Sequence, residues 1–179
     1  MSNTDVQAEW GKLTQEVRIG VLLTMRRGKP FGSHVPYMLG KNWTRAYLHL
    51  SQLALHTQHL LQDPQVSLFL SEPDHVEKTP LALRRINLQS TAAILAPDAP
   101  TYAGMKERYL ARFPKSALKF GYADFPLWEL HLQDAHLALG FGQAYQATAP
   151  SPELWIHQQP ERNKLQAAEN SHQSFEGLG

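Results

Sequence analysis

Cysteine is missing from all 179 residues of the chain. Disulfide bonds, thiolate zinc sites, iron–sulfur clusters and cysteine nucleophiles are therefore excluded. The sequence also has no apolar run of membrane-spanning length, and its first ten residues, which include Asp5 and Glu9, lack a basic segment followed by an apolar one. We therefore expect a cytoplasmic protein that does not enter a membrane, which suits the absence of cysteine.

The sequence also has no large excess of positive or negative charge. The 17 basic and 16 acidic residues give a formal net charge of +1, too small to gather nucleic acid or an anionic membrane over the whole surface. Any anion must be held by a local site. The hydrophobic content of 42% is enough to build the core of one domain.

Apolar spacing indicates a mainly β protein with flanking helices. Helical spacing predicts helices over 5–17, 52–62 and 102–113, the second with Ser51 as its N-cap. Short apolar runs and alternation predict strands over 20–25, 31–39, 45–50, 66–70, 85–95, 128–132 and 137–145. So many strands with so few helices favour a closed or split antiparallel barrel of six to seven strands.

The composition changes near the end of the last predicted strand. From Thr148 onward it is rich in Pro, Gln, Asn, Ser and Glu and poor in apolar residues. We therefore expect a barrel domain over 1–147 and a C-terminal tail over 148–179 that is at most partly ordered.

The passage from a strand into a helix at Ser51 is the first candidate site. The N-terminus of a helix presents unpaired amides and a positive dipole end, and Ser51, His56 and Thr57 add donors close by. This pattern is typical of a phosphate cradle, and equally of an ordinary serine cap with solvated side chains. Arg85 shares a strand face with Asn87 and Gln89 and is a second candidate, although a solvated outer face explains that pattern too.

Other chemistries have weaker support in the sequence. His56 and His59 are three residues apart on a predicted helix, but there is no HExxH motif or histidine-rich cluster to complete a zinc site. No Gly-x-Ser-x-Gly elbow, GxGxxG loop or Walker loop is present. The sequence therefore identifies no catalytic residue and predicts no metal site.

Five short segments resemble, in order, a known family. They are 32–37 (GSHVPY), 51–57 (SQLALHT), 63–68 (DPQVSL), 124–125 (DF) and 140–145 (GFGQAY). Their order and the predicted strands resemble the FMN-binding split barrels of the pyridoxamine 5′-phosphate oxidase-like superfamily, and in particular its bacterial haem-utilisation branch. The resemblance implies a homodimer with two ligand sites between the subunits, each built from both chains.

The resemblance also assigns residues to an FMN site. It places Ser33, His34 and Val35 at the edge of the isoalloxazine ring. The strand-to-helix junction, with Ser51, His56 and Thr57, would hold the phosphate, and Arg85 is an additional charge partner.

Three functions remain open from the sequence. The preferred one is an FMN-dependent oxidoreductase acting on an unidentified small, flat substrate; a related flavin or deazaflavin would satisfy the same phosphate cradle. The second is a haem-binding or haem-degrading protein, for which the resemblance implies a C-terminal histidine as axial ligand; the aligned position holds Arg162, so His157 or His172 would have to take that role, with Asp124 nearby. The third is a non-enzymatic carrier of flavin or haem.

Overall fold

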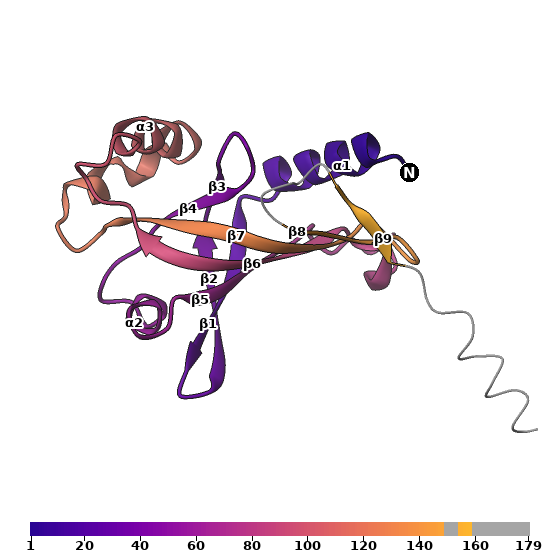
Figure 1. The fold of residues 1–179 in the computed structure, drawn as a ribbon, viewed down its shortest axis with the longest axis horizontal. Coiled ribbons are helices and arrows are strands. Elements are labelled where there is room, and N and C mark those ends of the chain that lie inside the picture. The colour runs from indigo at the N-terminus through magenta and orange to yellow at the C-terminus, as the bar shows by residue number, and fades with distance from the viewer. Residues whose placement is uncertain (149–153, 159–179) are drawn as a thin grey trace, which may run out of the picture.

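The computed structural model describes residues 1–148 and 154–158, and Figure 1 shows their arrangement. The helical elements are α1 (Asn3–Glu16), α2 (Leu55–Gln62), α3 (Tyr102–Arg112) and the 3-10 segments η1 (Pro80–Ala82) and η2 (Pro114–Gly121). The strands are β1 (Ile19–Arg26), β2 (Lys29–Pro36), β3 (Met38–Leu39), β4 (Arg45–His49), β5 (Gln65–Ser71), β6 (Arg85–Ile94), β7 (Leu127–Ala138), β8 (Ala144–Thr148) and β9 (Ile156–Gln158).

The strands form one antiparallel sheet in the order β2-β1-β5-β6-β7-β4-β3. β8 pairs with the second half of β7, where β4 has ended, and β9 pairs with β8. The sheet curls around the main apolar core into a half-barrel (Figure 1). This confirms the predicted mainly β, antiparallel split barrel with flanking helices.

The helices occupy separate positions around the sheet. α1 lies at the end that carries β8 and β9, and α2 lies at the other end (Figure 1). The predicted apolar stripe of α1 is buried, and the helix begins with a capping box between Ser2 and Asp5. α3 and η2 cover the outer side of β3 and β4 through a second, smaller apolar cluster built around Tyr47 and Tyr109.

The predicted strand over 31–39 is wrong in one respect, because it breaks at Tyr37. β2 pairs along its whole length with β1, through a two-residue turn at Arg27 and Gly28 whose φ values of 50° and 74° suit a hairpin. β3 pairs instead with β4. Tyr37 is buried between them, and its hydroxyl donates to the carbonyls of Val17 (2.6 Å) and Thr14 (3.1 Å) at the end of α1.

The prediction of separate strands over 128–132 and 137–145 is also wrong, because it places the boundary between the strands too early in the chain. β7 runs without a break from Leu127 to Ala138, and the hairpin turn to β8 lies at Gly140–Gly142. Ser90 pairs with Leu132 and Gln89 with Asp134, so Gln133 is the extra residue of a β-bulge. From position 128 onward, buried side chains of β7 lie at even-numbered positions before the bulge and at odd-numbered positions after it. This change of phase made the alternation in the sequence resemble two separate strands.

The strand β9 lies within the predicted tail. It extends the sheet beyond β8, and the preceding Trp155 is buried against Trp10 of α1, with 4.9 Å between the ring centroids. Its indole nitrogen donates to Gln7. Among the described residues, no helix is long and apolar enough to cross a membrane.

Candidate functional site

The junction between β4 and α2 differs from the prediction in where the helix starts. Ser51 is not the N-cap: its hydroxyl accepts a hydrogen bond from the Leu53 amide (3.2 Å) and its carbonyl accepts one from the Ala54 amide (3.2 Å). These bonds form a turn that delays the helix to Leu55 and leaves Ala54 as the N-cap.

The N-terminus of α2 has no side-chain cap within the described part of the chain. The amides of Thr57 and Gln58 donate to the Ala54 carbonyl, which leaves those of Leu55 and His56 without an intrahelical partner. No acidic residue lies in the first turn to neutralise the positive end of the dipole. This end of the helix therefore offers free donors to an anion.

The side chains of the first turn point in different directions. His56 is half-buried, and burial lowers the pKa of its imidazole, with a further lowering from nearby His59. His56 is therefore neutral at pH 7 and acts there as a hydrogen-bonding group. Thr57 is fully buried, and its hydroxyl has no partner among the described residues. His59 is also buried, and its Nδ1 lies 2.9 Å from the hydroxyl of Thr24 on β1.

The structure brings Asp124 to this junction. The Gln52 amide donates to the Asp124 main-chain carbonyl (2.7 Å), and the Ser51 hydroxyl lies 3.4 Å from the Asp124 carboxylate. The sequence segments 51–57 and 124–125, both quoted for the family resemblance, are therefore neighbours in space.

Aromatic rings and two lysines lie beside the same junction, and sequence reasoning missed Lys106, Lys119 and Phe120 among them. The buried His49, at the end of β4, donates from Nε2 to the Phe125 carbonyl (2.8 Å) and stacks on Phe120 at 3.8 Å. Lys106 lies 5.1 Å from the Phe120 ring and Lys119 lies 6.0 Å from the Phe125 ring. Burial lowers the pKa of His49, and the two lysines lower it further although the Phe125 hydrogen bond opposes them. Lys106 follows Met105 of the predicted helix, but no sequence pattern placed it beside Phe120.

The predicted ring-contact residues lie on β2, which is an edge strand in the described sheet. The Val35 side chain is buried, Ser33 is partly buried and His34 is exposed. α2 packs near this strand, because the His59 ring contacts Phe31 at 5.1 Å. The backbone along the free edge of β2 is therefore available next to α2.

Arg85 is not brought to the junction within one subunit. It opens β6 beside η1, and its guanidinium donates to the carbonyls of Leu81 (3.3 Å) and Leu83 (3.0 Å). Ser51 lies near the other end of that strand, where Ile94 pairs with Trp128. Nine residue steps of about 3.3 Å put the two ends roughly 30 Å apart (Figure 1).

His157, the described one of the two histidines suggested as haem ligands, lies toward the opposite end of β7 from Asp124. His157 lies on β9 and donates from Nε2 to the Gly142 carbonyl (3.0 Å), with Tyr145 against its ring at 4.9 Å. β9 is at the α1 end of the sheet (Figure 1). His172 lies outside the described residues.

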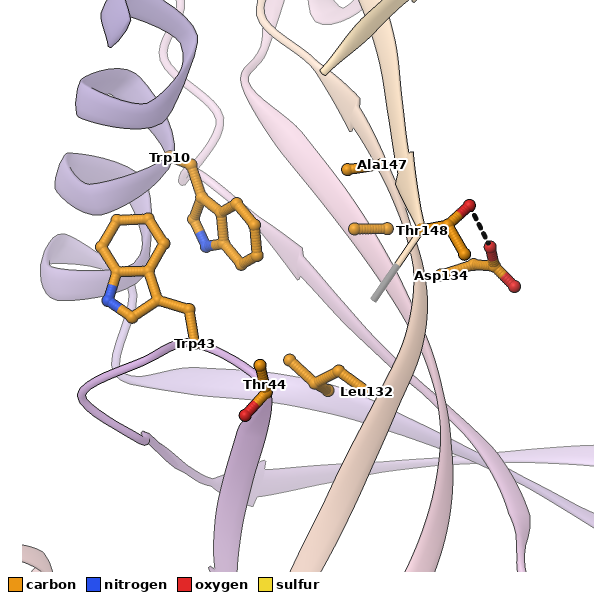
Figure 2. Close-up of a pocket in the computed structure, with 8 residues that line it drawn as sticks. Trp10, Trp43, Thr44, Leu132, Asp134, Ala147 and Thr148 are labelled. Carbon is orange, nitrogen blue, oxygen red and sulfur yellow. Dashed lines mark hydrogen bonds between the residues drawn. The ribbon is translucent and has the colours of Figure 1, made fainter. Parts of the chain in front are cut away.

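Figure 2 shows an apolar cavity at the α1 end, between Trp10 and Trp43 on one side and Leu132 and Ala147 on the other. Its volume of about 10 Å³ leaves room for no more than one water molecule. A larger hollow of about 260 Å³ lies on the outer face of β1, β5, β6 and β7. Its polar lining residues include Gln65, Gln89 and Gln133. Of these two, the hollow at Gln65, Gln89 and Gln133 is the one large enough to accept part of a ligand.

No family model matches the chain. The chain is 25% identical over 144 residues to the heme oxygenase HutZ of Vibrio cholerae, and the match covers 78% of each protein. The solved structure of HutZ, described as a heme storage protein, has a TM-score of 0.63 at 23% identity and covers 70% of this chain and 89% of HutZ.

Two further solved structures share the fold. A heme binding protein from Mycobacterium smegmatis has a TM-score of 0.72 at 26% identity, covering 82% of this chain. This chain spans only 59% of the length of that protein. A putative pyridoxamine 5′-phosphate oxidase from Listeria innocua has a TM-score of 0.55 at 10% identity, covering 75% of this chain and 99% of the other. The predicted resemblance to the pyridoxamine 5′-phosphate oxidase-like split barrels and their haem-utilisation branch is confirmed.

Proposed function

We propose that this chain binds FMN at the N-terminus of α2 and serves as a flavin oxidoreductase for a small, flat substrate. The observation that carries the proposal is the start of α2 without a side-chain cap or an acidic residue among the described residues. The amides of Leu55 and His56 meet the need of a phosphate for several directed donors. A bound flavin supplies the electron chemistry, and the protein supplies anchorage and orientation.

Most groups around the junction between β4 and α2 suit a bound phosphate, and one carboxylate opposes it. His56 adds a donor, and so does Ser51 once its hydroxyl turns from the Asp124 carboxylate to which it donates. Lys106 and Lys119 add positive charge near the rings of Phe120 and Phe125. The Asp124 carboxylate opposes an anion at Ser51. The free edge of β2, with Ser33, His34 and Val35, is adjacent and suits the polar edge of the flavin ring.

The proposal includes a cytoplasmic homodimer. Leu53, Leu118 and Tyr122, close to Asp124 or the start of α2, are 83%, 80% and 57% exposed and give the second subunit an apolar surface to cover. Because Arg85 is remote from Ser51 in its own subunit, its predicted role at the phosphate requires that it come from the second subunit.

Haem binding is the second candidate, and it is favoured by the similarity to HutZ and to the heme binding protein of M. smegmatis. His157 is the described candidate for an axial ligand, and it must leave Gly142 to serve that role. It too would meet Asp124 only across two subunits. A third possibility is that the protein carries flavin or haem without catalysing a reaction. Repeated turnover with a reductant would distinguish an oxidase from such a carrier.

Absorption spectra of the purified protein, repeated after titration with FMN and separately with haemin, test the proposal. We expect a saturable flavin band shift that Ser51→Ala and His56→Gln weaken and that His75→Gln, at an exposed position in the β5–β6 connection, leaves unchanged. Reoxidation of the bound flavin in repeated cycles with a reductant would establish turnover. A Soret band with haemin that His157→Ala removes, without FMN uptake, would overturn the flavin assignment.

A further inference from the structure

A groove separates the β3–β4 turn from α3, at the opposite end of β4 from Ser51. It consists of two adjoining hollows of about 400 and 770 Å³. Both are lined by Gly40, Lys41, Arg108 and Ala111. Their size lies in the range of small-molecule sites. The amide donors proposed for FMN do not line either hollow.

The groove carries positive charge without an ion-pair partner. Lys41 lies on the turn and Arg108 on α3, and neither forms an ion pair with any carboxylate in residues 1–148 or 154–158. Arg108 donates from Nη2 to the Leu39 carbonyl (3.2 Å), which holds the guanidinium against β3 while other N–H groups remain for a ligand. Glu107 is the one carboxylate that lines the groove.

A second arginine deepens the positive potential at the inner end. Arg112 lies one turn after Arg108 and donates to the carbonyls of Thr14 (3.0 Å) and Val17 (3.2 Å), at the C-terminus of α1. Its Nε is buried without a partner among the described residues. Burial lowers the pKa of Arg112; Tyr37 opposes this lowering, and the charge of Arg18 adds to it.

The rest of the lining combines the polar residues Thr14, Gln15 and Asn42 with an apolar and aromatic part. Met38, Leu39 and Trp43 line the smaller hollow, and Tyr47 and Met105 line the larger one. Trp43 is fixed in place because its ring packs on Trp10, with 4.9 Å between the centroids (Figure 2). A flat apolar body could therefore lie on this wall with its charged end at Arg108.

We propose that this groove binds a small organic anion, with an aromatic body on Trp43 and Met105 and a carboxylate or phosphate on Arg108 and Lys41. Uncompensated guanidinium and ammonium groups recognise the oxyanion, and the apolar wall selects an organic ligand over inorganic phosphate. The site is separate from the proposed FMN site and does not depend on it.

Isothermal titration calorimetry with 2-naphthoate, 2-naphthyl phosphate and the neutral 2-naphthol tests the proposal. We expect saturable binding of one or both anions with a change in Trp fluorescence, and at least tenfold weaker binding of 2-naphthol. Whichever anion binds more tightly identifies carboxylate or phosphate as the preferred group.

Variants then locate the binding. Arg108→Gln and Lys41→Glu should each weaken anion binding tenfold or more, whereas Lys115→Gln, on exposed η2, should not change it. Ala54→Asp, at the proposed FMN site, should also leave it unchanged. Lys41 is exposed, so its variant keeps the test valid if Arg108→Gln fails to fold. Equal binding of 2-naphthol, or unchanged binding in the Lys41→Glu protein, would overturn the proposal.

Discussion

The Ser51 hydroxyl and the Asp124 carboxylate lie 3.4 Å apart, although 73 residues separate them in the sequence. The Gln52 amide fixes this relationship by donating to the Asp124 main-chain carbonyl. An acidic group therefore stands beside the donors that we assign to the FMN phosphate. Its charge should reduce the affinity of the site for an anion.

Replacement of Asp124 by Asn tests that effect directly. Because a negative charge close to the phosphate is removed, Asp124→Asn should tighten FMN binding roughly three- to tenfold at low ionic strength. Fluorescence titration with FMN at two salt concentrations measures the change, which should shrink as salt rises. Asp74→Asn, at an exposed position in the β5–β6 connection, is the matched control. Equal affinities of wild type and Asp124→Asn would place the phosphate elsewhere.

Ala54 offers a test in which stability and binding change in opposite directions. Its extended backbone, with φ −72° and ψ 141°, suits an N-cap, so Ala54→Asp should stabilise the protein by about 0.5–1 kcal/mol. The new carboxylate would occupy the free amides and repel the phosphate, weakening FMN binding by roughly tenfold or more. Thermal unfolding and FMN titration measure the two effects.

The neutral variant Ala54→Asn is the control for this experiment. It caps the helix similarly without adding charge, so it should stabilise the protein while weakening FMN binding less than Ala54→Asp. A stabilised Ala54→Asp protein that binds FMN as wild type does would contradict the phosphate site at α2.

Much of the fold follows from local patterns in the sequence. The 3.6-residue spacing predicted α1 and α3 to within a few residues, and alternation predicted β5 and β6. Three boundaries escaped prediction because they depend on local hydrogen bonds and pairing, and one of them is the break between β2 and β3 at Tyr37. The turn made by Ser51 delays α2, and the bulge at Gln133 changes the phase of β7.

The candidate site was predictable only as a segment. Its strand-to-helix junction is visible in the sequence, because unpaired amides follow from any helix start. The sequence cannot show that Lys119 adjoins His49 or that Arg85 is distant from Ser51, since these relations depend on strand order. The same holds for the groove, where Lys41 and Arg108 come from separate elements.

Arg84 links α1 to the sheet through ion pairs, and these pairs should make the free energy of unfolding depend on pH in the acid range. It pairs with Glu72 (3.0 Å), Glu9 (3.3 Å) and Glu16 (2.7 Å). Burial raises the pKa of Glu72, but the Arg84 amide and the Lys78 and Arg84 side chains outweigh it and hold the pKa below the ordinary 4.5. The stabilisation by Glu72 is therefore present above pH 4.5 and is lost as the pH falls through the lowered pKa.

Arg84→Gln should lower the free energy of unfolding by about 2–4 kcal/mol at pH 7, because Glu72 stays buried with only Lys78 and the main-chain amide of residue 84 beside it. The difference from wild type should narrow below pH 4.5, where Glu72 takes up a proton in the variant. Urea denaturation at pH 7 and pH 4 measures both differences. Arg26→Gln, at an exposed position, should have little effect; a loss at pH 4 as large as at pH 7 would assign the role of Arg84 to packing.

Mixed dimers test whether each FMN site is shared by two subunits. Arg85 and Ser51 lie near opposite ends of β6, a strand roughly 30 Å long, so a site that uses both must join two chains. Ala54→Asp homodimers and Arg85→Gln homodimers should each bind FMN weakly, because each defect affects both sites. A heterodimer of the two variants has one site with both defects and one site with neither.

Co-expression with two different affinity tags isolates this heterodimer. We expect it to bind one FMN per dimer with wild-type affinity, measured by fluorescence titration after light scattering has confirmed the dimeric mass. The wild-type dimer, purified with the same pair of tags, should bind two. No recovery in the heterodimer would mean that both residues act on the site of one chain, and Arg85→Gln homodimers with wild-type affinity would remove Arg85 from the site.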